Sequence, residues 1–286
     1  MLEVIFWDVQ HGSAAYLKTP KGKHFAIDLG VGDYSESNEE FSPLMHLKNK
    51  YKITQLDEVI ITHPHTDHID DILNFDSLNP RALSRPEHLT EEDIRAANHN
   101  YDSEKIDKYL EINNRYNQPV LDNENPEYPE NNGDVTFRKF VPTNCGKSNI
   151  NNHSMVTIIE YLHVKIIIPG DNESASWKEL LDNADFVEAI KDADIFLASH
   201  HGRESGFYSD LFEHFKPKLV IVSDGAETDT SAVSRYSAVA EGWTIYDANG
   251  KEETRYCLTT RNDGAILVKV GKSGNGRTFM QVTKGY

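Results

Sequence analysis

The chain has 286 residues, of which 38% are hydrophobic, and its 29 basic and 46 acidic residues give a net charge of −17. This length can bury a substantial core, and we expect a single enzyme-sized domain spanning residues 1–286. The negative charge argues against a protein that grips nucleic acid unaided, because such proteins usually present a basic face. No apolar run approaches the ~20 residues that cross a bilayer, which excludes a membrane channel.

The first residues, Met1-Leu2-Glu3-Val4-Ile5-Phe6, lack a basic leader and are interpreted as a first strand. We therefore expect a cytoplasmic protein that does not contact a membrane. The two cysteines, Cys145 and Cys257, are too few for a disulfide framework, so both thiols are expected to be reduced.

Short apolar blocks separated by turn residues predict strands interspersed with helices. Strands are predicted near residues 2–8, 14–19, 24–28, 58–61, 135–141, 155–160, 164–168, 194–198, 218–222, 243–246 and 264–270. Helices are predicted near residues 42–50, 68–74, 174–181 and 207–215. This order is typical of a sandwich of two sheets covered by helices.

The densest chemical signal is the run His63-Pro64-His65-Thr66-Asp67-His68, directly after the apolar stretch Val59-Ile60-Ile61-Thr62. Imidazole and carboxylate are ligands that zinc, manganese and iron share, and a loop at the end of a buried strand holds them in fixed directions. The first two histidines can face one ion while Asp67 and His68 turn to another. A solvated polar turn is the alternative, but it is a poor explanation for a cluster of this density.

The stretch from about 87 to 132 differs from its surroundings and is interpreted as an insertion beside the histidine-rich turn. Its first part, 91–116, has a helical rhythm with one amphipathic face, formed by Ile94, Ala97, Tyr101, Ile106, Tyr109, Leu110 and Ile112. Its second part, 122–132, is rich in Asn, Glu and Pro and predicts a loop. Two roles stay open, a lid that selects substrate and a solvated excursion that contributes little.

A site for two metals needs further ligands from distant strands, and later strand boundaries supply candidates. Asp171 follows an apolar strand and a glycine, and His200 and His201 follow another apolar run. His153 lies just before a strand. Each also has a plain structural interpretation: Asp171 as a helix N-cap, His153 as a turn residue and His200 as a packed core histidine.

Together, the order His-x-His-x-Asp-His, a later His, a strand ending in Gly-Asp and a strand-end His resembles the metallo-β-lactamase superfamily of metal-dependent hydrolases. In its details the chain is similar to the hydrolase domain of ComEC-type competence proteins, which are associated with DNA uptake. The matching segments are Phe6 to Ala14, Ile27 to Gly30, Asn151 to Ser154, His200 to Gly202, Pro217 to Ser223 and Thr260 to Ile266. The similarity covers nearly the whole chain except its middle.

This resemblance implies an αββα fold and two divalent metal ions, zinc or manganese, with iron as a further choice. It implies that one ion is held by His63, His65, His153 and Asp171. It implies that the other is held by Asp67, His68, Asp171 and one of His200 and His201. Strand alternation is expected to turn only one of these two neighbouring histidines into the site. The residues expected to take part in catalysis are Asp67, Asp171 and His201.

Three further residues are candidates for supporting roles. Asp8 and Asp28 occupy positions where carboxylates would orient ligating imidazoles, although an Asp at a strand end also commonly caps a turn. Arg203 follows the His-His-Gly motif and could bind a substrate phosphate in bidentate fashion. An exposed salt bridge is an equally good explanation for this arginine.

The chain also departs from the family pattern. The opening turn of relatives usually reads Asp-Val-Gly-Gln-Gly-Asp, whereas Gln10, His11 and Ser13 stand at its variable places here. Relatives often carry an Asn and a Tyr followed by His-Pro after the strand ending near Asp224, but residues 227–236 contain neither His nor Pro. The placement of substrate in relatives therefore cannot be transferred to this chain.

Two ions held in this way would lower the pKa of a bridging water toward ~7 and present a hydroxide to phosphorus or to a carbonyl. The sequence thus predicts a di-metal hydrolase, with a phosphodiesterase or nuclease acting on DNA favoured by the resemblance. A small phosphodiester, a cyclic nucleotide or a lactone is the alternative substrate. A third hypothesis is an effector module that is active only with a partner, for instance a basic protein that offsets the net charge of −17.

Overall fold

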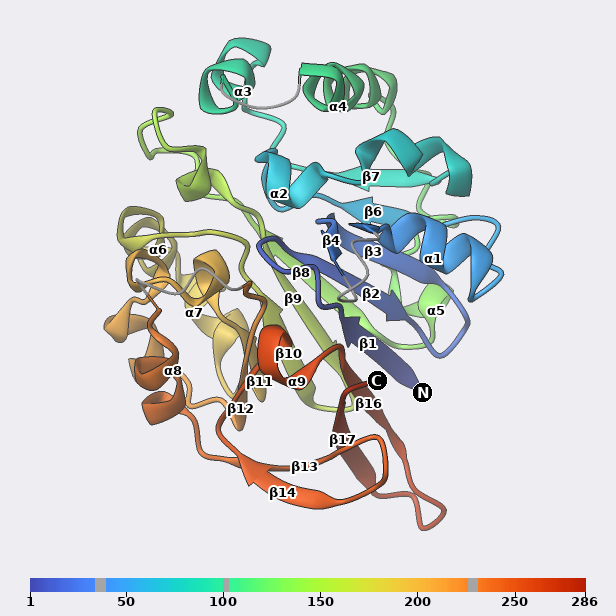
Figure 1. Cartoon of the computed structure of the whole chain (residues 1–286), viewed down its shortest axis with the longest axis vertical. Helices are drawn as coiled ribbons and strands as arrows, with labels where there is room; N and C mark the ends of the chain where they lie inside the picture. The colour runs from blue at the N-terminus through green and yellow to red at the C-terminus, as the bar shows by residue number, and fades with distance from the viewer. Residues whose placement is uncertain (34–39, 100–102, 226–230) are drawn as a thin grey trace.

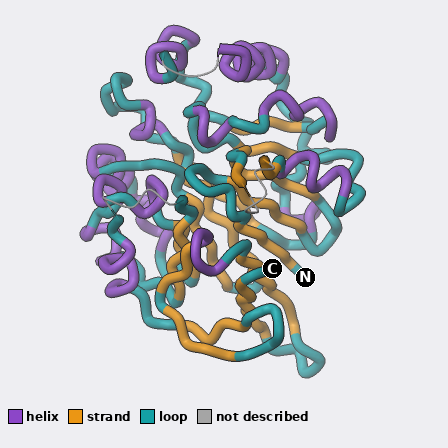
Figure 2. The backbone as a smooth tube through the Cα atoms, viewed as in Figure 1, coloured by secondary structure: helices purple, strands orange, loops and turns teal. Residues whose placement is uncertain are grey.

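The computed structural model describes residues 1–33, 40–99, 103–225 and 231–286. Two large mixed sheets pack face to face, and helices cover both outer faces (Figure 1). Figure 2 shows the strands as the central layers between these helices. The predicted αββα sandwich is thus confirmed. Within the described ranges, no helix combines the length and apolar character needed to cross a bilayer.

The first sheet has the strand order β14-β13-β17-β16-β1-β2-β3-β6-β7. Its strands are β1 (Leu2–Phe6), β2 (Ala14–Lys18), β3 (His24–Leu29), β6 (Glu58–Ile60), β7 (Ala82–Ser84), β13 (Trp243–Tyr246), β14 (Glu252–Arg255), β16 (Ile266–Lys272) and β17 (Thr278–Lys284). β1, β2 and β3 are antiparallel neighbours, whereas β3, β6 and β7 run parallel. Parallel strands end at the same edge of a sheet, so the loops after β6 and β7 lie close together.

The second sheet has the order β15-β12-β11-β10-β9-β8. Its strands are β8 (Thr136–Phe140), β9 (Val156–Tyr161), β10 (Val164–Ile168), β11 (Ile195–Leu197), β12 (Leu219–Val222) and β15 (Cys257–Thr259). The neighbours β10, β11, β12 and β15 are parallel, so their carboxyl ends share one edge. A separate pair, β4 (Gly32–Asp33) and β5 (Glu40–Phe41), is antiparallel.

Alternation along the strands divides the core into three layers. Val4 and Phe6 of β1 belong to the cluster between the sheets, while Ile5 faces the helices on the outer side. In β10, Ile166 lies in the central cluster and Ile167 in the outer one. Because side chains of a strand alternate between its faces, each sheet can bury both faces only when an apolar layer covers each of them.

The helices complete these outer layers. They are α1 (Pro43–Asn49), α2 (Thr66–Ile69), α3 (Glu91–Ala97), α4 (Ser103–Arg115), α5 (Pro129–Asn132), α6 (Ser174–Leu181), α7 (Ala184–Ile190), α8 (Val233–Val239) and α9 (Thr260–Asp263). Residues of α1, α2, α3 and α4 pack on the nine-stranded sheet, and residues of α6, α7 and α8 pack on the six-stranded sheet. Local sequence sets where several of them begin: the Ser42 side chain accepts from Met45 N, and Thr90 and Asp93 form a capping box.

Most predicted elements are present, with some differences. Each predicted strand corresponds to an observed one, whereas β4, β5, β7, β14, β15 and β17 and the helices α5, α7, α8 and α9 were not predicted. The predicted helix 68–74 is divided between α2, which ends at Ile69, and a 3-10 helix at Ile72–Leu78. The predicted helix 207–215 is instead a 3-10 turn at Ser209–Glu213. Phe207, Leu211 and Phe215 are nevertheless buried, so this segment packs against the core without forming an α-helix.

The segment 87–132 contains α3, α4 and the short α5. The helical rhythm predicted over 91–116 thus corresponds to two helices, and Tyr101, which was included in it, lies outside the described residues. Figure 1 shows α3 and α4 beyond β7, at one end of the nine-stranded sheet. The predicted loop 122–132 is largely irregular, with α5 as its only regular part among the described residues.

Candidate metal centre

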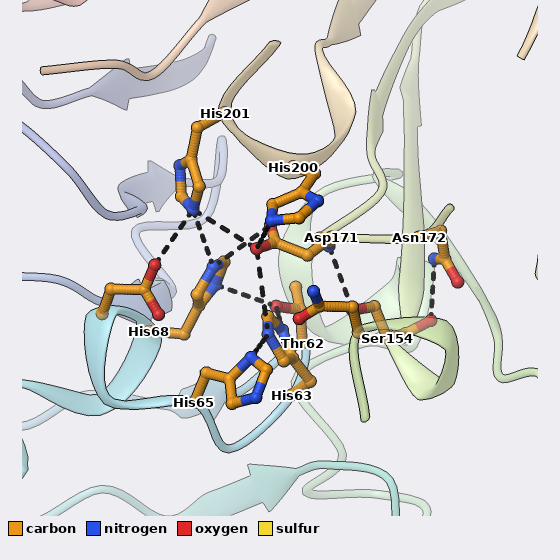
Figure 3. A network of polar contacts seen from close by, with 12 residues as sticks. Thr62, His63, His65, His68, Ser154, Asp171, Asn172, His200 and His201 are labelled. Atoms are coloured by element: carbon orange, nitrogen blue, oxygen red, sulfur yellow. Dashed lines mark hydrogen bonds and ion pairs between the residues drawn. The ribbon is translucent and has the colours of Figure 1, made fainter. Parts of the chain in front are cut away.

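Histidine and aspartate side chains from both sheets converge at the edge where parallel strands end (Figure 3). The turn after β6 and the first residues of α2 supply one group, and the loops after β10 and β11 supply the other. The residues in this cluster are His63, His65, Asp67, His68, Asp171, His200 and His201.

The tightest part of the cluster comprises Asp67, His68, Asp171 and His201, whose potential ligand atoms all lie within 4.8 Å of one another. His201 Nε2 is 3.2 Å from Asp67 Oδ2 and 3.3 Å from Asp171 Oδ2. His68 Nε2 is 3.2 Å from Asp171 Oδ1. Two carboxylates and two imidazoles at these distances can hold a divalent metal ion.

A second group, His63 and His65, also lies close to Asp171. His63 Nε2 is 3.0 Å from His65 Nδ1 and 3.9 Å from Asp171 Oδ2. Asp171 contacts imidazoles of both groups: Oδ1 approaches His68, and Oδ2 approaches both His63 and His201. This is the position that a carboxylate between two ions needs.

His153 is fully buried just before β9. Its Nδ1 is 3.2 Å from Pro142 O and 2.9 Å from His88 Nε2. Its Nε2 is buried and has no hydrogen-bond partner among the described residues. A buried imidazole nitrogen left without a partner costs free energy unless something else occupies its lone pair, and a metal ion would do so.

The supporting contacts of the cluster hold its imidazoles in place. His68 Nδ1 donates to Asp28 Oδ2 at 2.8 Å, while the Thr62 N–H donates to Asp28 Oδ1 at 2.7 Å. His201 Nδ1 donates to the Ser223 carbonyl at 3.1 Å. These bonds leave Nε2 of both histidines directed at Asp171, which is how ligating imidazoles are usually oriented.

The other proposed orienting carboxylate lies differently. Asp8 accepts hydrogen bonds from the backbone N–H and the side-chain amide of Gln10, each at 3.2 Å. These contacts stabilise the turn after β1, and its neighbour Gly12 lets that turn approach the metal-binding loop. A Cβ on Gly12 would lie 2.7 Å from the Asp67 carbonyl oxygen, and one on Gly30 would lie 2.8 Å from it.

The neighbouring His200 and His201 both have left-handed backbones, with φ of 50° and 53°. β11 ends at Leu197, so the alternation expected of a strand does not apply to them. His201 reaches Asp67 and Asp171, whereas His200 bonds through Nδ1 to Glu173 Oε1 at 3.0 Å, with Nε2 3.9 Å from Asp171 Oδ2. Two consecutive left-handed non-glycine residues are strained, and such strain is typical of functional sites.

One side of the cluster is open to solvent. The Asp67 side chain is 25% exposed, and His11 Nε2 lies 3.6 Å from its Oδ2. Arg203 Nη2 is 3.4 Å from the same His11 nitrogen. Arg203 was predicted from the sequence to contact substrate. His11 was identified there only as a departure from the opening turn that relatives share.

The electrostatics of the cluster favour positive charge at its centre. Burial lowers the pKa of His63 well below its usual value, so this imidazole stays neutral with a free lone pair. Burial acts in the same direction on His201, but Asp171 and Asp67 outweigh it and raise the pKa of His201 to about 10. Burial would raise the pKa of Asp171, yet His201 and His68 hold it well below its usual value. A divalent cation would supply the same positive charge, and its binding would release the proton that His201 holds between Asp67 and Asp171.

Sequence reasoning missed several residues that position the site. Ser154 Oγ accepts the Asp171 N–H at 3.0 Å, and the Asn172 side chain donates to the Ser154 carbonyl at 3.0 Å. Glu173 and Ser205 both contact His200 Nδ1. Ser154 ends the segment Asn151 to Ser154 that carried the family resemblance, but no role was assigned to it. Nothing in a local pattern separates the other residues from ordinary loop residues.

The fold and the cluster together define an αββα protein with a buried histidine and aspartate site suited to divalent metal. A scan against protein-family models and a search of curated proteins found no match.

Among solved structures, the metallo-β-lactamase fold protein YhfI from Bacillus subtilis is similar at 12% identity and a TM-score of 0.44, over 98% of this chain and 99% of that chain. A Thermotoga maritima protein assigned to the zinc-dependent hydrolases of the metallo-β-lactamase superfamily is similar at 12% identity and a TM-score of 0.42, over 90% of this chain and 97% of that chain. A diphosphatase from the PhnP family has the same identity and TM-score, over 92% and 96%. Likeness this low carries no argument about the reaction.

Proposed function

We propose that this protein is a metal-dependent hydrolase that cleaves phosphodiesters. The observation that carries the proposal is the placement of Asp171, a buried carboxylate 3.9 Å from His63, which in turn contacts His65, and within 3.3 Å of both His68 and His201. Separate imidazole sets around one shared carboxylate suit two adjacent divalent ions.

In this proposal His63, His65, His153 and Asp171 hold one ion. Asp67, His68, Asp171 and His201 hold the other. Zinc, manganese and iron all suit such ligands. When bound, the ions would supply Lewis acidity and an activated water.

The remaining residues act on the substrate. Asp67 is partly exposed and can accept a hydrogen bond from the attacking water. His11 and Arg203 lie beside it and can donate to phosphate oxygens. His200 Nδ1 donates to Glu173, which leaves the lone pair of its Nε2 facing the site, where it can accept a hydrogen bond or a proton from the substrate or the attacking water.

The segment 87–132 is proposed as an insertion that shapes this site within one hydrolase domain. The Asn98 side chain donates to the Pro64 carbonyl at 2.9 Å and accepts from Thr66 Oγ1 at 3.1 Å, so the segment packs on the metal-binding turn. His88 of the same segment contacts His153. These contacts support a role in substrate selection over a solvated excursion.

DNA is the first substrate to test, because the resemblance to ComEC-type hydrolase domains points to nucleic acid. The net charge of −17 favours a second candidate, a small phosphodiester such as a cyclic nucleotide, since it repels a polyanion at long range. A basic partner protein would reconcile the charge with a nucleic-acid substrate.

The test is cleavage of end-labelled single- and double-stranded DNA, and in parallel of cyclic AMP, by protein loaded with Mn²⁺ or Zn²⁺. His65→Ala should abolish turnover, whereas His99→Ala, an exposed histidine of the same insertion, should not. DNA cleavage that requires both metal and His65 supports a nuclease, and cleavage of the cyclic nucleotide alone supports the small substrate. Turnover that persists in His65→Ala would refute the metal assignment.

A further inference from the structure

His153 has two hydrogen-bond neighbours at one ring nitrogen and no partner at the other. Its Nδ1 lies 3.2 Å from the Pro142 carbonyl oxygen and 2.9 Å from His88 Nε2, whereas its Nε2 is buried without a partner among the described residues. A carbonyl oxygen can only accept a hydrogen bond, so the proton of this imidazole belongs on Nδ1. The lone pair of Nε2 is then free, which is the form in which a neutral imidazole binds a metal ion.

This tautomer also fixes the role of His88. Because the proton lies on His153 Nδ1, the lone pair of His88 Nε2 accepts it, and the His153 N–H is shared between His88 and the Pro142 carbonyl. The centroids of the two imidazole rings are 4.9 Å apart, with their planes tilted by 53°. Two acceptors in different directions hold the His153 ring more firmly than one, so the direction of its Nε2 depends in part on His88.

His88 is itself held in place by contacts of its backbone. Lys147 Nζ donates to the His88 carbonyl at 3.1 Å and to Asp93 Oδ2 at 2.7 Å. Asp93 also forms the capping box with Thr90 at the start of α3. Lys147 precedes His153 in the same loop region, so one lysine joins the beginning of the segment 87–132 to the loop that carries His153.

The residues that follow His153 are bonded to the metal centre from two directions. Ser154 Oγ accepts from the Asp171 N–H at 3.0 Å, and the Met155 N–H donates to the Thr62 carbonyl at 2.8 Å. Asp171 is the shared carboxylate, and Thr62 directly precedes the histidine-rich turn. This placement fits the assignment of His153 to the same ion as the first histidines of that turn.

We propose that His88 is a positioning residue for the ion assigned to His153: it accepts the Nδ1 proton of His153 and thereby keeps Nε2 directed at the ion. The inference rests on the proposed function, because that function makes His153 a ligand. Asp28 has the corresponding role for His68 at the other ion. His88 belongs to the insertion, so the insertion supports one ion and not the other.

The test is a two-site titration of metal-free protein with Zn²⁺ or Co²⁺, measured by calorimetry and by competition with a chromophoric chelator. His88→Ala should weaken the binding of one ion about 10–100-fold and leave the other nearly unchanged, because it removes the partner of only one ligating histidine. His88→Gln should restore most of the affinity, since its Oε1 can accept the same proton. His99→Ala, an exposed histidine of the same insertion, is the matched control and should bind both ions like the wild type.

Nitrogen chemical shifts of the His153 ring in metal-free protein give a second readout, which does not depend on metal affinity. The Nδ1-protonated tautomer is expected. A ring protonated on Nε2 would overturn the proposal, because His88 would then be the donor and His153 would not present a free lone pair.

His153→Ala distinguishes failure of this inference from failure of the proposed function. If His153→Ala loses one ion while His88→Ala binds both like the wild type, the metal assignment stands and His88 has no positioning role. If His153→Ala keeps both ions at full affinity, the ligand set of the proposed function is wrong.

Two further results would contradict the role of His88. Equal weakening of both ions in a folded His88→Ala would show a general structural effect. Equal losses in His88→Ala and His88→Gln would show that the accepted hydrogen bond does not position His153.

Discussion

His68 donates its Nδ1 proton to Asp28 Oδ2 at 2.8 Å, and this bond turns its Nε2 toward Asp171. Asp28 is itself held by Thr62, through the backbone N–H and the hydroxyl. The contact joins β3 to the metal-binding turn after β6, so the parallel pairing of these strands positions a ligand.

Asp28→Asn should weaken metal binding about 10–100-fold, because removing the carboxylate behind a ligating histidine loosens its orientation. Asn also tolerates the left-handed backbone at this position, where φ is 56°, so the fold should survive. Competition with a chromophoric chelator measures the effect, and Asp247→Asn in an exposed turn is the control. Equal affinities of the two variants would contradict the role of Asp28.

His200→Ala and His201→Ala should separate metal binding from substrate contact. His201→Ala should lose bound metal, because His201 Nε2 lies within 3.3 Å of both Asp67 and Asp171. His200→Ala should keep its metal but lower kcat about 100-fold or more, because it removes an acceptor that can take a proton at the reacting centre. Metal content and kcat are measured on the same samples. Loss of metal in His200→Ala would show that His200 is a metal ligand and would contradict its assignment as a substrate contact.

Gly30→Ala should destabilise the fold by about 1–3 kcal/mol, the usual cost of overpacking. Its Cβ would lie 2.8 Å from the Asp67 carbonyl oxygen and 2.9 Å from Ser13 N. Gly274→Ala is the matched control, because nothing lies within 4 Å of a Cβ there. Urea unfolding measures both variants, and an unchanged midpoint for Gly30→Ala would show that the turn can move away at little cost.

Glu127 should make stability depend on pH. Burial and the neighbouring Glu58 raise the pKa of Glu127 from 4.5 to about 7. The folded state therefore binds more protons than the unfolded state between these values. The stability contributed by this group is complete below pH 4.5 and is lost as pH rises through about 7, with a slope of at most about 1.4 kcal/mol per pH unit.

Glu127→Gln should remove this part of the pH dependence. Urea midpoints of wild type and variant, measured from pH 5 to 8, test it. Parallel curves for the two proteins would mean that Glu127 titrates normally in the folded chain.

Local patterns in the sequence predicted many of the secondary-structure elements of this protein. Alternating apolar residues predicted the strands that form the centres of both sheets, because burial of a strand face depends mainly on that periodicity. The run from His63 to His68 marked the chemical centre by density alone. The short strands β7 and β14 show the limit. β7 pairs with β6, which lies more than twenty residues earlier in the chain. β14 pairs with the adjacent strand β13, but its sequence Glu252–Arg255 has no alternating apolar residues by which it could be predicted.

Only the tertiary structure decided which side chains meet. Asp8 and Asp28 look alike in sequence, yet Asp28 reaches His68 while Asp8 bonds Gln10, because strand pairing sets their distance from the turn. His200 and His201 were expected to alternate, but the strand ends earlier and left-handed backbones bring both toward Asp171 by different routes. The sequence by itself determined the ligand types and the alternating strands. Contacts between residues far apart in the chain, which no local pattern encodes, decided the geometry of the site.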